Sequence, residues 1–347
     1  MRKDFCAGCG SVVFFENVRC LKCGRQLGFL PTSGTVAALE PGPDNLFRVC
    51  SVAGGGPTYR ACGNGARYQV CNWMIPADDP APLCVACRLN QTIPDLGVPG
   101  NLARWHSLEV AKRRVIYGLL RLDLPLAAAP GSDAPSLRFA FLADSPGTSP
   151  VATSHSKGLI TINISEADDV ERERVRVLMR EQYRTLVGHL RHEIGHFYWD
   201  RLVARTRWLH QVRASFGDES ADYAQALSSY YRREPPVNWA ERGASPYASS
   251  HPSEAWAEAW AHYLHIMDTV ETAAEFGILP HRVSTTPGTR LIDAFSFDQI
   301  LELWRPLACA VNTLNRGLGL PDLYPFVLSP AAIGQLSLVS KVIRGSR

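Results

Sequence analysis

The sequence has no apolar run long enough to cross a bilayer, and its first residues lack the apolar core of a signal peptide. Its net charge is only +3 over 347 residues, so a strongly basic surface for nucleic acid or anionic lipid is not expected. The hydrophobic fraction of 46% is that of an ordinary globular chain. We therefore expect a cytoplasmic protein that has no contact with membranes and is unlikely to bind nucleic acid.

The ten cysteines are distributed unevenly, with nine before residue 90 and Cys309 alone near the other end. A disulfide framework is typical of secreted chains, and no secretion signal accompanies these cysteines. Clustered cysteines in a reducing compartment are more typical of metal sites. The N-terminal region is therefore expected to bind zinc through thiolates.

The first cysteine group has two C-x2-C pairs, Cys6/Cys9 and Cys20/Cys23, ten residues apart. Four thiolates at this spacing suit a tetrahedral structural Zn²⁺. A unit of about thirty residues buries little surface, so the metal would supply much of its stability. We predict a zinc ribbon at residues 1–30. The alternative is a set of free or catalytic thiols.

The second group offers one further C-x2-C pair. A second structural zinc site is predicted from Cys62, Cys71, Cys84 and Cys87, which leaves Cys50 spare. The alternative is a buried cysteine cluster without metal. Residues 31–95 are thus interpreted as a second zinc-binding module. Its first part, residues 31–48, is a Pro-, Gly- and Ala-rich linker. The ribbons could recruit a protein partner.

The remainder, residues 96–347, is expected to be mostly helical with a small β-sheet, which makes the chain α+β. Helical patterns cover residues 101–122 and 252–272, and residues 167–205 suggest two helices or one bent helix. Residues 159–164 alternate in the manner of a β-strand.

An HExxH motif lies at residues 192–196, within the helical segment 167–205. Residues four apart share one face of a helix, so His192 and His196 could both bind one Zn²⁺. Glu193 would lie beside the metal and accept a proton from water. Two histidines placed by chance are the alternative. Asp200, four residues after His196, could orient that histidine.

A catalytic zinc needs a third protein ligand, and two later acidic segments qualify. One is residues 218–222, whose acids could equally cap a helix. The other holds Glu254 and Glu258, four apart on an otherwise apolar helix. We predict Glu254 as the ligand and Glu258 as the acceptor from a ligand histidine. A solvated helix face is the alternative for this pair.

The segment from Tyr247 to Glu258 resembles the second motif of gluzincin peptidases such as the anthrax lethal factor and Mlc titration factor families. Trp256 stands where those families have Phe. The resemblance implies Glu254 as the third zinc ligand and the Tyr247 hydroxyl as a group that steadies the oxyanion.

A broader resemblance is to a bacterial family in which a zinc ribbon precedes a zinc-binding metallopeptidase domain. The matching pieces lie at residues 6–29, 71–74, 84–95, 189–200 and 251–266. The resemblance implies a zincin-like domain with one catalytic Zn²⁺ and one or two structural Zn²⁺ ions.

The function predicted from these patterns is zinc-dependent hydrolysis of peptide bonds in a peptide or protein substrate, with Glu193 as the base. The strand at 159–164 could pair with an extended substrate. The alternative is a zinc-ribbon module that binds protein or nucleic acid, attached to a zinc-binding scaffold without turnover.

Overall fold

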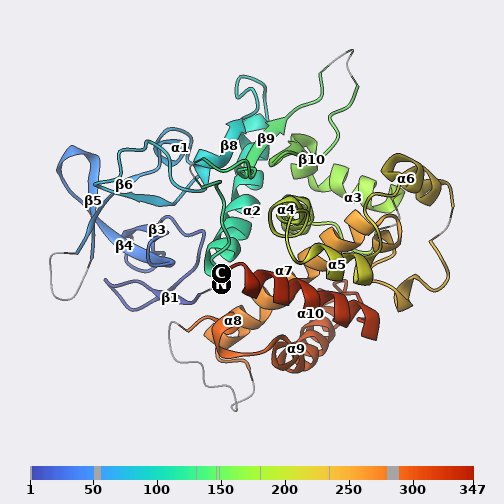
Figure 1. Ribbon diagram of the computed structural model, residues 1–347. Helices are drawn as coiled ribbons and strands as arrows, with labels where there is room; N and C mark the ends of the chain where they lie inside the picture. The colour runs from blue at the N-terminus through green and yellow to red at the C-terminus, as the bar shows by residue number, and fades with distance from the viewer. Residues whose placement is uncertain are drawn as a thin grey trace.

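The computed structural model describes residues 2–347 except for 51–55, 130, 146, 148, 180, 234 and 280–288. Figure 1 shows the N-terminal strands on one side and a largely helical body on the other. This arrangement confirms the predicted α+β class. No helix in the described ranges is both long enough and apolar enough to span a membrane.

The N-terminal region contains two antiparallel sheets. Strands β1 (Asp4–Phe5) and β2 (Val12–Val13) form a hairpin beside the first cysteine group. Five further strands pair in the order β3-β4-β5-β6-β7. Their bounds are Gln26–Leu30, Thr35–Pro41, Leu46–Val49, Thr58–Ala61 and Met74–Pro76.

The predicted linker at 31–48 is wrong, because β4 and most of β5 lie within it. Val36 and Ala38 are buried and alternate with less buried residues. This alternation is that of a β-strand with one face toward the core. The predicted division at residue 30 falls at the end of β3, which pairs with β4 directly.

A third, mixed sheet has the order β10-β11-β9-β8, with bounds Ser154–Ser156, Leu159–Asn163, Arg138–Leu142 and Asn90–Thr92. Strand β11 confirms the strand predicted near residue 160. It is paired on both sides, parallel to β9 and antiparallel to β10. The expectation that β11 itself binds a peptide is therefore wrong, and β10 is the edge strand.

Ten α-helices occur in the described residues. Their bounds are α1 Gly63–Tyr68, α2 Asn101–Arg121, α3 Asp169–Leu178, α4 Leu186–Leu202, α5 Leu209–Phe216, α6 Tyr223–Arg232, α7 Pro252–Glu275, α8 Leu291–Ala294, α9 Phe297–Gly317 and α10 Pro330–Gly345. The predicted helices at 101–122 and 252–272 are confirmed as α2 and α7. The segment 167–205 forms two helices, α3 and α4.

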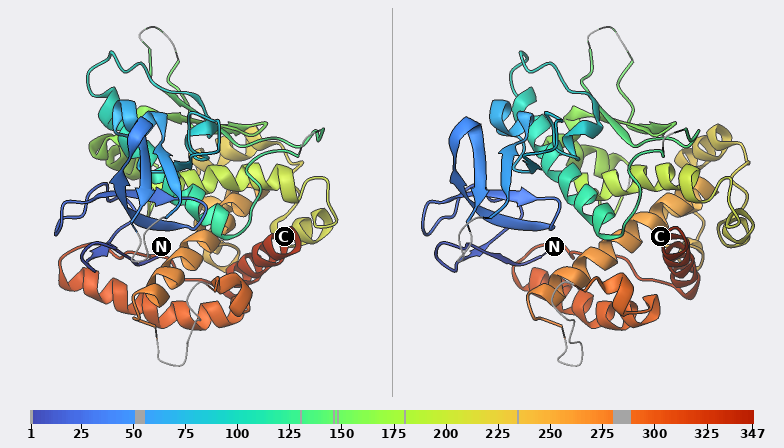
Figure 2. Two further views of the ribbon diagram at one scale, coloured as in Figure 1. Left: turned by 90° about the vertical axis from the view of Figure 1, so that its left-hand side faces the viewer. Right: turned by 60° about the vertical axis from the view of Figure 1, so that its left-hand side comes forward.

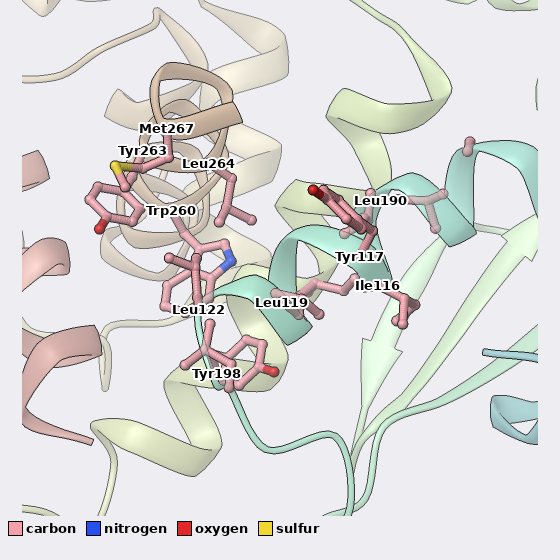
Figure 3. Close-up of a cluster of buried hydrophobic side chains, with 14 of the residues drawn as sticks. Ile116, Tyr117, Leu119, Leu122, Leu190, Tyr198, Trp260, Tyr263, Leu264 and Met267 are labelled. Carbon is pink, nitrogen blue, oxygen red and sulfur yellow. The ribbon is translucent and has the colours of Figure 1, made fainter. Parts of the chain in front are cut away.

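Helices α2, α4 and α7 pack together and form the centre of the core. Figure 3 shows Ile116 and Leu119 of α2 beside Leu190 of α4. The rings of Tyr198 and Trp260 stack with centroids 4.7 Å apart, which joins α4 to α7. In Figures 1 and 2 the β8–β11 sheet and helices α9 and α10 lie on opposite sides of α4 and α7. Helices α4 and α7 are therefore held on both sides.

Candidate metal centre

Helix α4 places the two histidines of the HExxH motif. Thr185 caps its N-terminus by accepting a hydrogen bond from the Gly188 backbone N–H over 3.0 Å. His192 and His196 lie one turn apart with ring centroids separated by 5.0 Å. Both imidazoles thus face the neighbouring helix, α7, from the same side of α4.

Helix α7 places Glu254 opposite these histidines. Its first turn is set by Pro252 at the first helical position and by the His251 ring, which accepts from the Ser253 backbone N–H. Glu254 lies in this turn, almost fully buried, with Oε2 2.9 Å from Nε2 of His192 and Oε1 3.5 Å from Nε2 of His196. Burial raises the pKa of Glu254, but the two histidines outweigh it and lower the pKa below its usual range.

The side chains of His192, His196 and Glu254 together fit a zinc ion. Their ligand atoms all lie within 4.8 Å of one another. Two imidazole nitrogens and one carboxylate oxygen are a donor set of catalytic zinc sites, which keep a fourth position open. The negative charge of buried Glu254 would also be compensated by the cation. The structure thus brings the three predicted ligands together.

Glu258 lies one turn after Glu254 and contacts Nδ1 of His192, the ring nitrogen opposite the one that faces Glu254. Its Oε1 accepts a hydrogen bond from Nδ1 of His192 over 2.8 Å, and its Oε2 accepts one from the Ser245 hydroxyl. With Nδ1 occupied, Nε2 of His192 faces Glu254. This is the orienting contact predicted for Glu258.

Glu193 lies beside the three candidate ligands and is 6% exposed. Its Oε1 is 3.4 Å from Nε2 of His189, one turn earlier on α4. Burial raises the pKa of Glu193, but His189 and the two motif histidines lower it overall. The side chain is therefore held as a carboxylate, the form that accepts a proton.

Two tyrosines approach the site from different elements. Tyr247, in a short 3₁₀ turn at Tyr247–Ser249, has its ring centroid 5.9 Å from that of His192. The hydroxyl of Tyr223, at the start of α6, donates to Oε1 of Glu254 over 2.8 Å. Burial raises the pKa of Tyr223 above its usual value, and the charge of Glu254 adds to this effect. The structure thus adds Tyr223 to the one tyrosine predicted.

Asp200 does not hold His196 as predicted. It is exposed, and no hydrogen bond joins it to His196 within the described part of the chain. Burial of its carboxyl raises the pKa of Asp200, and the charge of His196 only reduces this rise. One full turn along α4 separates the two residues, and both line the same cleft.

The acidic side chains at 218–222, the other candidate source of the third zinc ligand, form contacts within or close to their own segment. Asp222 caps α6 by accepting from the Gln225 backbone N–H, and Asp218 accepts from that of Ser220. Glu219 forms an ion pair with Arg213 over 2.7 Å. These acids therefore form backbone hydrogen bonds or an ion pair within their own segment. Glu254 is the carboxylate that contacts both histidines.

The first cysteine group forms one compact cluster. The four sulfur atoms of Cys6, Cys9, Cys20 and Cys23 lie within 4.8 Å of one another. Gly10 and Gly24 follow the two pairs with φ of 70° and 74°, and each donates its backbone N–H to the carbonyl of the first cysteine of its pair. Four converging thiols around two such turns fit a structural zinc site.

The second cysteine group also converges. The sulfur atoms of Cys62, Cys71, Cys84 and Cys87 meet the same 4.8 Å limit. The backbone N–H of Cys84 donates to the sulfur of Cys62, a contact that favours the thiolate form. Cys50 and exposed Cys309 belong to neither cluster. The structure thus groups the cysteines as predicted.

Comparison with known proteins assigns both parts of the chain to protein families. A family model described as "Putative zinc-binding metallo-peptidase" matches residues 101–342, and one described as "zinc-ribbon domain" matches residues 4–98. The chain belongs to the zinc-ribbon metallopeptidase family. Uncharacterized proteins of Mycobacterium bovis and Mycobacterium tuberculosis are 39% identical over 344 residues, covering 99% of this chain and 95% of theirs. No solved structure matches it significantly.

In this member of the zinc-ribbon metallopeptidase family, the candidate centre opens into a cleft of about 990 Å³. Its walls come from α4, α7, α6 and the edge strand β10, including His155, Tyr230 and Tyr231. The volume is at the upper end of the range found for ligand pockets.

Sequence reasoning missed two groups in this cleft. Tyr223 directly follows Asp222, and only the cap at Asp222 gave a signal for a helix start there. His189, one turn before His192 on α4, contacts both Glu166 and Glu193. Glu166 lies 23 residues before His189, and no spacing rule connects them.

Proposed function

We propose that this chain is a zinc-dependent peptidase that hydrolyses peptide bonds in peptide or protein substrates. The observation that carries the proposal is the convergence of His192, His196 and Glu254 in an open cleft, with the carboxylate of Glu193 beside them. A zinc site without turnover has no need of a base in that position.

His192, His196 and Glu254 would hold the zinc ion, which when bound acts as a Lewis acid and lowers the pKa of water. Glu193 accepts a proton from the attacking water and passes it to the leaving amine. Tyr223 and Tyr247 both line the cleft, and their hydroxyls would donate to the negative charge that develops on the substrate carbonyl oxygen.

Substrate binding is proposed along β10, which pairs with β11 on one side and packs beside α4 on the other. An extended peptide could add to this edge as a further strand, with its side chains in the cleft. The two cysteine clusters are proposed to hold structural Zn²⁺, which gives three ions per chain. Their free thiols favour a reducing compartment, the cytoplasm, and the ribbon could contact a protein partner.

The test is Glu193→Gln, compared with Glu302→Gln on an exposed face of α9. Both variants are assayed for zinc content and for cleavage of a peptide library. We expect Glu193→Gln to retain zinc and to lower kcat by about 10²–10⁴-fold, while Glu302→Gln behaves as wild type. Wild-type protein that binds zinc but cleaves no peptide would favour the binding-module alternative.

A further inference from the structure

His189 lies between two carboxylates, one on each ring nitrogen. Its Nδ1 is 2.6 Å from Oε2 of Glu166, and its Nε2 is 3.4 Å from Oε1 of Glu193. Glu166 belongs to the 3₁₀ turn Ile164–Ala167 that follows β11, whereas His189 and Glu193 are one turn apart on α4. The three side chains form a continuous chain from the sheet to the candidate base.

The hydrogen bond to Glu166 requires an N–H on Nδ1, because an ionised carboxylate only accepts, and the contact with Glu193 is an ion pair when Nε2 is also protonated. A neutral imidazole has one N–H, so a ring that donates to both glutamates must be an imidazolium. Burial lowers the pKa of His189, but Glu166 and Glu193 outweigh it and raise the pKa to about 9. The bridge is therefore a cation between two anions at neutral pH.

Glu166 is itself held firmly. The Thr153 hydroxyl donates to its Oε1, and Arg184 lies 3.5 Å from its Oε2. Arg184 is in turn paired with Glu181 over 2.9 Å. Burial raises the pKa of Glu166, but His189, Arg184 and Thr153 lower it to about 2. An acceptor fixed from several elements restricts the orientation of the imidazole ring that it binds.

We propose that His189, anchored by Glu166, is a positioning residue that fixes the carboxylate of Glu193 in the cleft. The contact engages Oε1 of Glu193 and leaves Oε2 as the oxygen available to water. This inference rests on the proposed peptidase function. It differs from a purely structural ion pair, which would contribute to folding but would not control the geometry of the base.

The first part of the test measures catalysis in His189→Gln and Glu166→Gln. The matched controls are His210→Gln and Glu302→Gln, which change exposed residues outside the cleft. Glutamine at 189 has one amide donor group and no charge, so it cannot reproduce the bridge. We expect full zinc content, a KM close to wild type and a kcat lower by about 10–100-fold in both cleft variants. Wild-type kcat in both would overturn the proposal.

The second part does not depend on activity. Nitrogen NMR of protein with ¹⁵N-labelled histidine, assigned by the His189→Gln spectrum, reports protonation of each ring nitrogen. We expect both nitrogens of His189 to carry protons at pH 7, and Glu166→Gln to lower the pH at which the ring titrates. A singly protonated ring at pH 7 would overturn the bridge. Inactive wild-type protein with a doubly protonated ring would overturn the peptidase function and, with it, the role of His189 in catalysis.

Discussion

Nδ1 of His192 donates a hydrogen bond to Oε1 of Glu258 across 2.8 Å, while Nε2 of the same ring faces Glu254. One imidazole thus connects two glutamates that lie one turn apart on α7. The contact fixes the tautomer in which Nε2 has the free lone pair needed for a metal. Glu254 and Glu258 therefore have different tasks, although they have the same side chain.

Glu258→Gln tests this division. The amide oxygen of glutamine could still accept from Nδ1, but the loss of charge makes the His192 ring a weaker donor to zinc. We expect zinc affinity at the HExxH site to fall by about 10–100-fold, measured by competition with a chelator. Glu302→Gln on α9 is the control, and equal affinities in the two variants would contradict the role of Glu258.

The glycine within the HExxH motif is expected to be required for packing. A Cβ added at Gly195 would lie 2.9 Å from Cα of Ala257, so α4 and α7 would have to separate. We expect Gly195→Ala to lower the free energy of unfolding by about 1–3 kcal/mol in urea titrations.

Gly334 gives the matched control for that substitution. It lies in α10, and an added Cβ would meet no atom within 4 Å. Alanine there should raise the free energy of unfolding by about 0.5–1 kcal/mol through helix propensity. If both alanine variants shifted the unfolding free energy in the same direction, the close approach of α4 and α7 would not explain Gly195.

Tyr223→Phe and Tyr247→Phe compare the two candidate hydroxyl donors. Tyr223 already donates to Oε1 of Glu254, whereas Tyr247 contacts His192 through its ring. We expect Tyr223→Phe to lower kcat by about 10²-fold with zinc content unchanged, and Tyr247→Phe to have the smaller effect. The opposite order in the measured kcat values would favour the role that the family resemblance implies for Tyr247.

Cys62→Ser and Cys50→Ser test the assignment of the second cysteine cluster. Cys62 is buried among three other thiols, and Cys50 lies outside both clusters. Elemental analysis should find about one zinc fewer per chain in Cys62→Ser, together with a lower Tm, because metal binding contributes to folding. Cys50→Ser should keep all of its zinc. A loss of zinc in both variants would mean that the thiols are grouped differently.

The parts of the site that follow local spacing were predictable from the sequence. His192 and His196 are four apart on a helix, and so are Glu254 and Glu258, so each pair shares a helix face. The C-x2-C pairs likewise follow from the geometry of one tight turn. In each case the residues that act together lie within one turn of backbone.

The parts that depend on contacts between distant segments were not predictable. Tyr223 at the start of α6 donates to Glu254 on α7, and Glu166 in the turn after β11 contacts His189 on α4. The linker prediction failed for a related reason. The β4 segment is rich in small residues whose alternation carries little hydrophobic contrast, and its pairing with β3 and β5 makes it a strand.

Strand β8 lies within the region matched by the zinc-ribbon family model, yet it pairs with β9 of the region matched by the metallo-peptidase model. Nearby, Glu109 of α2 lies 3.9 Å from the sulfur of Cys87 and forms a fully buried ion pair with Lys112. The two family regions thus share a sheet and a charge network. They are expected to unfold as a single cooperative unit, so that losing zinc from the second cysteine cluster would also weaken the scaffold that holds the HExxH helix.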